Sequence, residues 1–115
     1  MKRNTYSSGL FAEWLARNYL RLFGYSVLKS RYVTGRNTGR AEIDIIARRG
    51  NLIIFVEVKN RPDAATGLEA VTMAQGCRLR AAAETWILRN RWMGDARFDV
   101  IVISGWRLRH FKNAV

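Results

Sequence analysis

The sequence has few of the residues that support many kinds of catalytic chemistry. Its 115 residues include a single cysteine, Cys77, a single histidine, His110, and a single proline. One cysteine excludes an internal disulfide and a cysteine-based zinc site, and one histidine leaves no choice of partners for a Ser/His/Asp or Cys/His arrangement. Hydrolytic chemistry in this chain must therefore depend on carboxylates, lysine and a metal ion that prefers oxygen ligands.

Long hydrophobic runs are also absent. The longest nearly uncharged apolar run, Asn51 to Val56, is far shorter than the ~20 residues of a membrane-spanning helix. The first residues lead into no apolar signal region, so we expect a cytoplasmic protein with no membrane partner. A hydrophobic content of 49% is enough to fill one core, and the length predicts one domain, residues 1–115.

Negative charge is scarce, because 9 Asp and Glu stand against 20 Lys and Arg and the formal net charge is +11. Sixteen of the 20 cations are arginine, whose planar guanidinium matches phosphate oxygens. The composition therefore predicts a polyanionic partner, and it favours nucleic acid over an acidic protein or an anionic membrane surface.

Hydrophobic periodicity and turn residues predict seven elements in the order αβββαββ. The elements are a helix over 7–23, strands over 25–33, 41–47 and 52–59, a helix that starts at a capping box at 72–75, and strands over 97–104 and 106–111. This order predicts an α/β fold in which helices flank a central mixed sheet.

Several single residues have structural interpretations. Large apolar residues of the first helix share one face, namely Leu10, Phe11, Trp14, Leu15, Tyr19 and Leu22. The four tryptophans fit core or interface positions, and only Trp92, in a loop, is a candidate for stacking on a base. We expect Cys77 to be mostly buried, Asp99 to be structural beside Arg97, and His110 to be a surface or packing residue.

Three carboxylates and a lysine interrupt two strongly apolar strands: Glu42 and Asp44 in one, Glu57 and Lys59 in the next. Alternation puts each pair on one strand face. Pairing of residues 48 and 51 sets Glu42 opposite Glu57, whereas pairing of residues 48 and 53 sets Asp44 opposite Glu57. In either register one cation can collect oxygens from Asp44 and Glu57, and such ligands favour Mg²⁺ or Mn²⁺.

Lys59, two residues after Glu57, is suited to help deprotonate a bound water or to stabilise charge on a phosphate. The layout therefore favours phosphodiester hydrolysis. The alternative is an ordinary strand end, with Lys59 in solvent and Glu57 paired to an arginine.

The same segments carry a resemblance to a known family. Glu42–Ala47, Phe55–Arg61 and Arg97–Val100 closely resemble the bacterial YraN-type family, which is similar to the PD-(D/E)XK nuclease superfamily and to archaeal Holliday-junction resolvases. The resemblance spans nearly the whole chain. It implies a restriction-endonuclease-like fold, a Mg²⁺-dependent nuclease that acts on DNA rather than RNA, on structured or branched DNA, and by analogy a homodimer. A non-catalytic nucleic-acid-binding module that keeps the fold is the alternative.

The resemblance also implies site residues. It makes Asp44 and Glu57 the metal ligands, Lys59 the catalytic lysine and Glu13 an additional acidic residue of the site. Two positions depart from the family pattern: an alanine stands at 41, where the family usually has glycine, and Gln75 stands where it usually has lysine.

Each accessory residue has a structural alternative. Glu13 can form a surface ion pair with Arg17 one helical turn later, Glu42 can pair with an arginine instead of being a second ligand, and Gln75 can cap its helix. Phosphate contact is the expected role of the arginines that would flank the carboxylates, namely Arg36, Arg40, Arg61 and Arg78.

Overall fold

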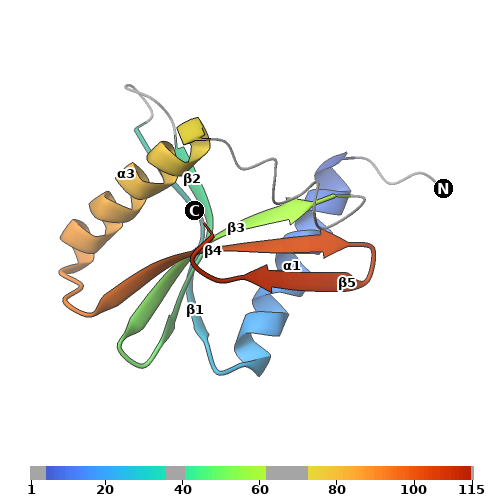
Figure 1. Ribbon diagram of the computed structural model, residues 1–115, viewed down its shortest axis with the longest axis horizontal. Helices are drawn as coiled ribbons and strands as arrows, with labels where there is room; N and C mark the ends of the chain where they lie inside the picture. Colours follow the sequence, from blue (N-terminus) through green and yellow to red (C-terminus); the bar gives the residue numbers. More distant parts are fainter. Residues whose placement is uncertain (1–4, 36–40, 62–72, 115) are drawn as a thin grey trace.

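The computed structural model describes residues 5–35, 41–61 and 73–114, with the side chains of 5–8 and 73–75 outside that description. The order αβββαββ is confirmed, and element ends differ from the expected ones by a few residues. The elements shown in Figure 1 are α1 (Thr5–Leu22), β1 (Ser26–Thr34), β2 (Ala41–Arg49), β3 (Leu52–Asn60), α3 (Met73–Asn90), β4 (Asp95–Ser104) and β5 (Arg107–Phe111).

The five strands form one mixed sheet in the order β1-β2-β3-β4-β5. All neighbours are antiparallel except β3 and β4, which are parallel. Parallel neighbours need a crossover between them, and α3 lies in the chain that connects these two strands. The helices α1 and α3 cover opposite faces of the sheet (Figure 1), which is the restriction-endonuclease-like arrangement.

The helix α1 packs on the sheet through small residues. Ala12, Ala16 and Leu20 are buried at one-turn spacing against the β2, β3 and β4 side chains of that face. The predicted face of large residues is therefore not the buried one, and Trp14 is half exposed. Alanine lets the helix axis approach the sheet closely, so bulkier neighbours on the helix point elsewhere.

The helix α3 buries the residues that its periodicity predicted, Leu79, Ala82, Ala83 and Trp86. Its packing side contains Phe55 of β3, whose ring meets the Trp86 indole edge-on at 5.9 Å. The expectation for Cys77 is wrong, because this residue lies on the exposed side of α3. Neither described helix combines the length and the apolar composition that a bilayer crossing requires.

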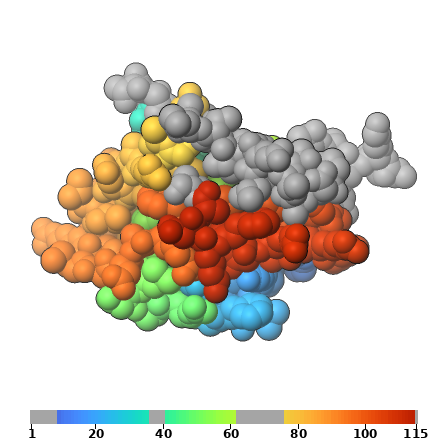
Figure 2. Space-filling view, in the orientation of Figure 1, coloured from blue at the N-terminus to red at the C-terminus, as the bar shows by residue number. Residues whose placement is uncertain are grey.

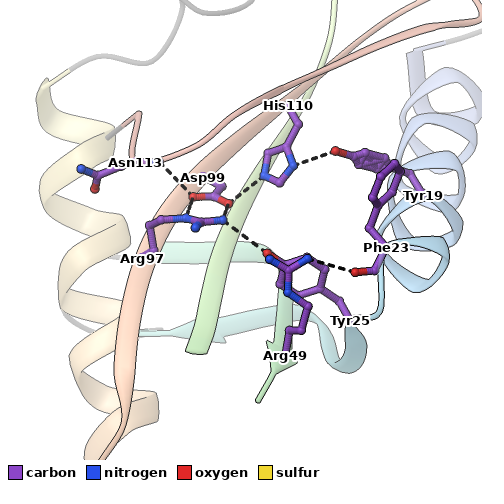
Figure 3. Close-up of polar contacts among 8 residues, drawn as sticks. All are labelled: Tyr19, Phe23, Tyr25, Arg49, Arg97, Asp99, His110 and Asn113. Atoms are coloured by element: carbon purple, nitrogen blue, oxygen red, sulfur yellow. Dashed lines mark hydrogen bonds and ion pairs between the residues drawn. The ribbon is translucent and has the colours of Figure 1, made fainter. Parts of the chain in front are cut away.

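Asp99, on β4, is fully buried and holds a hydrogen-bonded network together (Figure 3). Its carboxylate accepts two bonds of 2.8 Å from the Arg97 guanidinium and one of 3.0 Å from the Asn113 amide. It also contacts His110 Nε2 at 2.7 Å, and the other ring nitrogen of His110 lies 2.9 Å from the Tyr19 hydroxyl of α1. The structural interpretation of Asp99 and the packing interpretation of His110 are thus confirmed.

The network joins elements that are far apart in the chain. The strand β5 and the residues after it form a band across one face of the molecule (Figure 2), and Asp99 ties this band to β4 and to α1. Burial acts to raise the pKa of Asp99, but hydrogen bonds from His110, Arg97 and the Asn113 amide outweigh burial and lower this pKa to about 2. The charged form of Asp99 therefore stabilises the fold at neutral pH.

Replacing Asp99 with asparagine should destabilise the protein by about 3 kcal/mol, because it removes the buried charge that partners the half-buried Arg97. Urea denaturation at pH 7 measures this loss. The exposed carboxylate of Asp95, on the same strand, is the control, and Asp95→Asn should change the free energy of unfolding by less than about 0.5 kcal/mol. Equal effects of the two substitutions would contradict a structural role for the network.

Candidate active site

The strands β2 and β3 separate before either one ends. Their ladder runs from Arg49–Leu52, beside the tight turn, to Ile45–Val56 and stops there. Beyond that point β2 stays paired with β1 up to Ala41, and β3 stays paired with β4 up to Asn60. We call this place, which contains Asp44, Glu57, Val58 and Lys59, the sheet fork.

Asp44 provides a hydrogen-bond acceptor for a backbone amide at the sheet fork. Its carboxylate accepts a hydrogen bond of 2.8 Å from the amide of Val58. In a continued antiparallel ladder that amide would donate to the carbonyl of Ile43. The side chain of Asp44 therefore replaces a backbone acceptor for the amide of Val58.

The path of β2 also changes at Asp44. Ile43 and Ile46 both pack on the α3 side of the sheet, whereas Ile45 and Ala47 pack on the α1 side. Three positions separate two residues on the same face, so the alternation of side chains shifts by one residue near Asp44. This local irregularity turns the carboxylate toward β3.

Glu57 and Lys59 form an ion pair on β3, with 3.0 Å between the ammonium nitrogen and a carboxylate oxygen. Only 9% of the Lys59 side chain and 16% of the Glu57 side chain are exposed. The ladder pairs Arg48 with Ile53, which is the register that sets Asp44 level with Glu57. The alternative of a solvated Lys59 with Glu57 on an arginine is therefore not what the structure contains.

Burial, and then the negative charge of Glu57, raise the pKa of Asp44 to about 8. The hydrogen bond from Val58 acts in the opposite direction, and the charges of Glu13 and Glu42 add smaller upward effects. Three other carboxylates are thus close enough to disfavour the charge of Asp44. A cation placed among them would relieve this repulsion.

Glu13, on α1, is near enough to Asp44 for its charge to help raise the Asp44 pKa. Only 12% of the Glu13 side chain is exposed. Its partner is Arg31 of β1, at 2.8 Å, and not the predicted Arg17. Arg31 has a positive φ of 54°, which non-glycine residues seldom adopt. This backbone irregularity brings the Arg31 guanidinium to Glu13. Helical spacing pairs residues within one helix, so it does not predict this contact between α1 and β1.

The accessory residues are only partly within the described chain. Glu42 is exposed on β2 and contributes charge. Ala41 is buried, and its φ is not among the positive ones, so a methyl group in place of the family's glycine fits there. Arg36, Arg40 and the side chain of Gln75 lie outside the described residues.

Two predicted phosphate-binding arginines are described. Arg61 donates from its backbone to Ile103 and from its guanidinium to the carbonyl of Asn60. Arg78 is exposed on α3 and lines a cavity of about 430 Å³ together with Arg89, which the sequence analysis did not single out. The cavity walls also include Thr34, Ala41 and Thr85. We call this place the arginine cavity.

The donor set fits a hard divalent cation. Within residues 5–35, 41–61 and 73–114, no three Asp, Glu, His or Cys side chains lie close enough together to bind one metal ion. Mg²⁺ commonly takes only one or two carboxylates from a protein and completes its shell with water and phosphate. Asp44 and Glu57, level with each other at the sheet fork, match that requirement.

Sequence comparisons place the chain among known proteins. The sequence profile of the uncharacterised protein family UPF0102 matches residues 12–103. The chain belongs to this family. A UPF0102 protein of Paramagnetospirillum magneticum is 39% identical over 109 residues, which cover 92% of this chain and 84% of that protein. A UPF0102 protein of Rhizobium etli is 39% identical over 117 residues, which cover 99% of this chain and 93% of that protein.

The resemblance to the YraN-type family is thereby confirmed. The span that matches UPF0102 contains Glu13, Asp44, Glu57 and Lys59. The sheet fork therefore lies within the part of the sequence that defines the family.

The raised pKa of Asp44 predicts a pH-dependent stability. The fold retains this proton up to about pH 8, whereas an unfolded aspartate loses it near pH 3.9. Without metal, the free energy of unfolding should therefore fall as the pH rises from about 4 to about 8. Asp44→Asn keeps an oxygen for Val58 and carries no charge, so in EDTA at pH 8 it should melt a few degrees above the unsubstituted protein.

Thermal denaturation with millimolar Mg²⁺ gives the second half of this test. The unsubstituted protein should gain more stability from Mg²⁺ at pH 8 than at pH 5, since the ion competes with the proton. Asp44→Asn should abolish that gain, and the exposed control Glu84→Gln should retain it. An Mg²⁺-induced shift that persists in Asp44→Asn would exclude Asp44 as a ligand.

Proposed function

We propose that the protein is a Mg²⁺-dependent nuclease that hydrolyses phosphodiester bonds in DNA. The observation that supports this most is the arrangement at the sheet fork. There the Asp44 carboxylate accepts a hydrogen bond from the Val58 amide and lies level with the buried Glu57–Lys59 ion pair. Burying these groups is costly unless their charges are compensated, and a bound cation would compensate the carboxylates.

Each residue has a role under this proposal. Asp44 and Glu57 would hold Mg²⁺ or Mn²⁺, which when bound supplies an activated water and neutralises charge on the phosphate. Lys59 is held in position by Glu57, and its ammonium stabilises the charge that develops on the phosphate oxygens. Glu13, Glu42 and Gln75 are accessory residues that tune the charge and the contacts around the sheet fork.

The arginine cavity would hold the DNA backbone beside the sheet fork. Ala41 lines the cavity and lies three residues from Asp44 along β2, which is about 10 Å at the rise of a strand. Arg78 and Arg89 lie eleven positions apart on α3, so they can contact different phosphates. Arg36, Arg40 and Arg61 are further phosphate contacts in this proposal.

Cleavage assays test the catalytic role. The pure protein is incubated with single-stranded, duplex and branched DNA in Mg²⁺ or Mn²⁺, and we expect cleavage of at least one substrate. Lys59→Met should lower the rate about 10²–10³-fold, and Asp44→Asn should reduce it to background. Glu84→Gln, which replaces an exposed carboxylate of α3, should cleave normally.

Two results would defeat the catalytic proposal. One is the absence of cleavage beyond that of Asp44→Asn on every substrate. The other is tight DNA binding without cleavage, which would identify a nucleic-acid-binding module that retains the nuclease fold.

The salt dependence of binding tests the arginine cavity. Because each arginine that neutralises a phosphate releases about 0.9 counterion from duplex DNA, Arg78→Ala and Arg89→Ala should each make the negative slope of log K against log salt shallower by about that amount. Arg21→Ala, at the far end of α1, should leave the slope unchanged. Slopes that do not differ between Arg78→Ala and Arg21→Ala would remove the cavity from the DNA path.

A further inference from the structure

Three aromatic residues gather outside both cores. Phe11 and Trp14 of α1 lie with ring centroids 6.2 Å apart and planes inclined by 23°. The indole of Trp106, in the turn between β4 and β5, meets Phe11 edge-on at 5.2 Å. Trp14 is 51% exposed and Trp106 is 80% exposed. We call these three residues the aromatic platform.

The fold itself does not account for the aromatic platform. The contact between α1 and the sheet is made by Ala12, Ala16 and Leu20, so neither indole contributes to that core. Single exposed apolar residues are common on proteins, but large rings in mutual contact on the surface mark a binding site. Tryptophan in particular is enriched where a partner binds.

The aromatic platform lies at the same end of the sheet as the sheet fork. The parallel ladder sets Lys59 beside Val102, and Arg61 donates its amide to Ile103. Trp106 follows Val102 by four residues, which is at most about 13 Å along a strand. Figure 1 shows the end of β4 next to α1, which supplies the other two rings.

Cations accompany these rings. Arg107 directly follows Trp106 and is exposed, Arg17 lies one helical turn after Trp14, and Arg61 lies between the platform and the sheet fork. Aromatic faces interleaved with arginine are the combination that binds single-stranded nucleic acid, because any base can stack on a ring while the cation contacts phosphate. A base inside a duplex has no free face to present.

A second copy of this chain is a poorer occupant. A twofold contact over the platform would press the surface that carries Arg107 and Arg17 in one copy against the same cationic surface of the other. A chain with a net charge of +11 repels itself unless such charges are compensated, whereas a strand of phosphates attracts the same surface.

We propose that the aromatic platform stacks on unpaired bases of a single-stranded DNA segment that extends from the sheet fork. Given the proposed nuclease activity, on which this inference rests, the substrate is DNA with an unpaired stretch next to the scissile bond. Phe11 supports both indoles, and Trp14 and Trp106 present their exposed faces to the bases. The arginines beside them hold the phosphates of the same segment.

Binding to two oligonucleotides separates base stacking from charge. A fluorescein-labelled dT20 strand and an abasic strand of equal length carry the same phosphates, but only the first has bases. Anisotropy titration in EDTA, where no cleavage occurs, should show tighter binding of dT20. Trp106→Ala and Trp14→Ala should each weaken dT20 binding about tenfold and leave the abasic strand nearly unaffected.

Further variants distinguish stacking from mere hydrophobicity. Trp106→Phe should keep dT20 affinity within about threefold, whereas Trp106→Leu should lose it as Trp106→Ala does. Met93→Ala removes a side chain that is 93% exposed. Met93 precedes β4 whereas Trp106 follows it, so the two lie at opposite ends of that strand, and this control variant should bind dT20 normally. Thermal denaturation confirms that each variant is folded.

Three outcomes would overturn the inference: equal affinity for dT20 and the abasic strand, full rescue by Trp106→Leu, or a dimer in sedimentation equilibrium that Trp106→Ala dissolves. The proposed function fails separately. Asp44→Asn should bind dT20 as well as the unsubstituted protein does and yet not cleave, so a missing cleavage activity with intact base-dependent binding rejects only the nuclease.

Discussion

The hydrogen bond from the Val58 amide to the Asp44 carboxylate is the contact on which the candidate site depends. A sheet can open between two strands only if the exposed amides find other acceptors, because a buried amide without one costs about 1–3 kcal/mol. Asp44 supplies the acceptor at 2.8 Å. The same hydrogen bond fixes the position of the carboxylate. One side chain therefore both provides the Val58 amide with an acceptor and places a candidate metal ligand.

Two aspartates, Asp99 and Asp44, have pKa values that their surroundings shift in opposite directions. Asp99 is surrounded by Arg97, His110 and a backbone amide, and its pKa falls to about 2. Asp44 accepts a hydrogen bond from the Val58 amide and has other carboxylates nearby, and its pKa rises to about 8. Donors and a cationic partner thus stabilise the charge of Asp99, whereas burial and neighbouring carboxylates disfavour the charge of Asp44.

Much of the sheet fork could be predicted from the sequence. Alternation in β2 and β3 and a short turn allowed only two registers, and the one that sets Asp44 level with Glu57 is present. The partner of Glu13 could not be predicted, because Arg31 reaches it through a positive φ in β1. Local spacing rules favour partners one turn away, and this contact instead joins two elements across a backbone irregularity.

The orientation of α1 shows why its buried face was predicted wrongly and what that orientation achieves. Hydrophobic periodicity weights large side chains, but close packing on a sheet selects small ones, and Ala12 and Ala16 face the strands. Successive helical residues are about 100° apart. Once Ala12 points at the sheet, Glu13 must lie on one flank, toward Arg31, and Phe11 on the other, toward the β4–β5 turn. A single rotation of the helix thus sets an acid beside the sheet fork and leaves the rings of Phe11 and Trp14 outside the core.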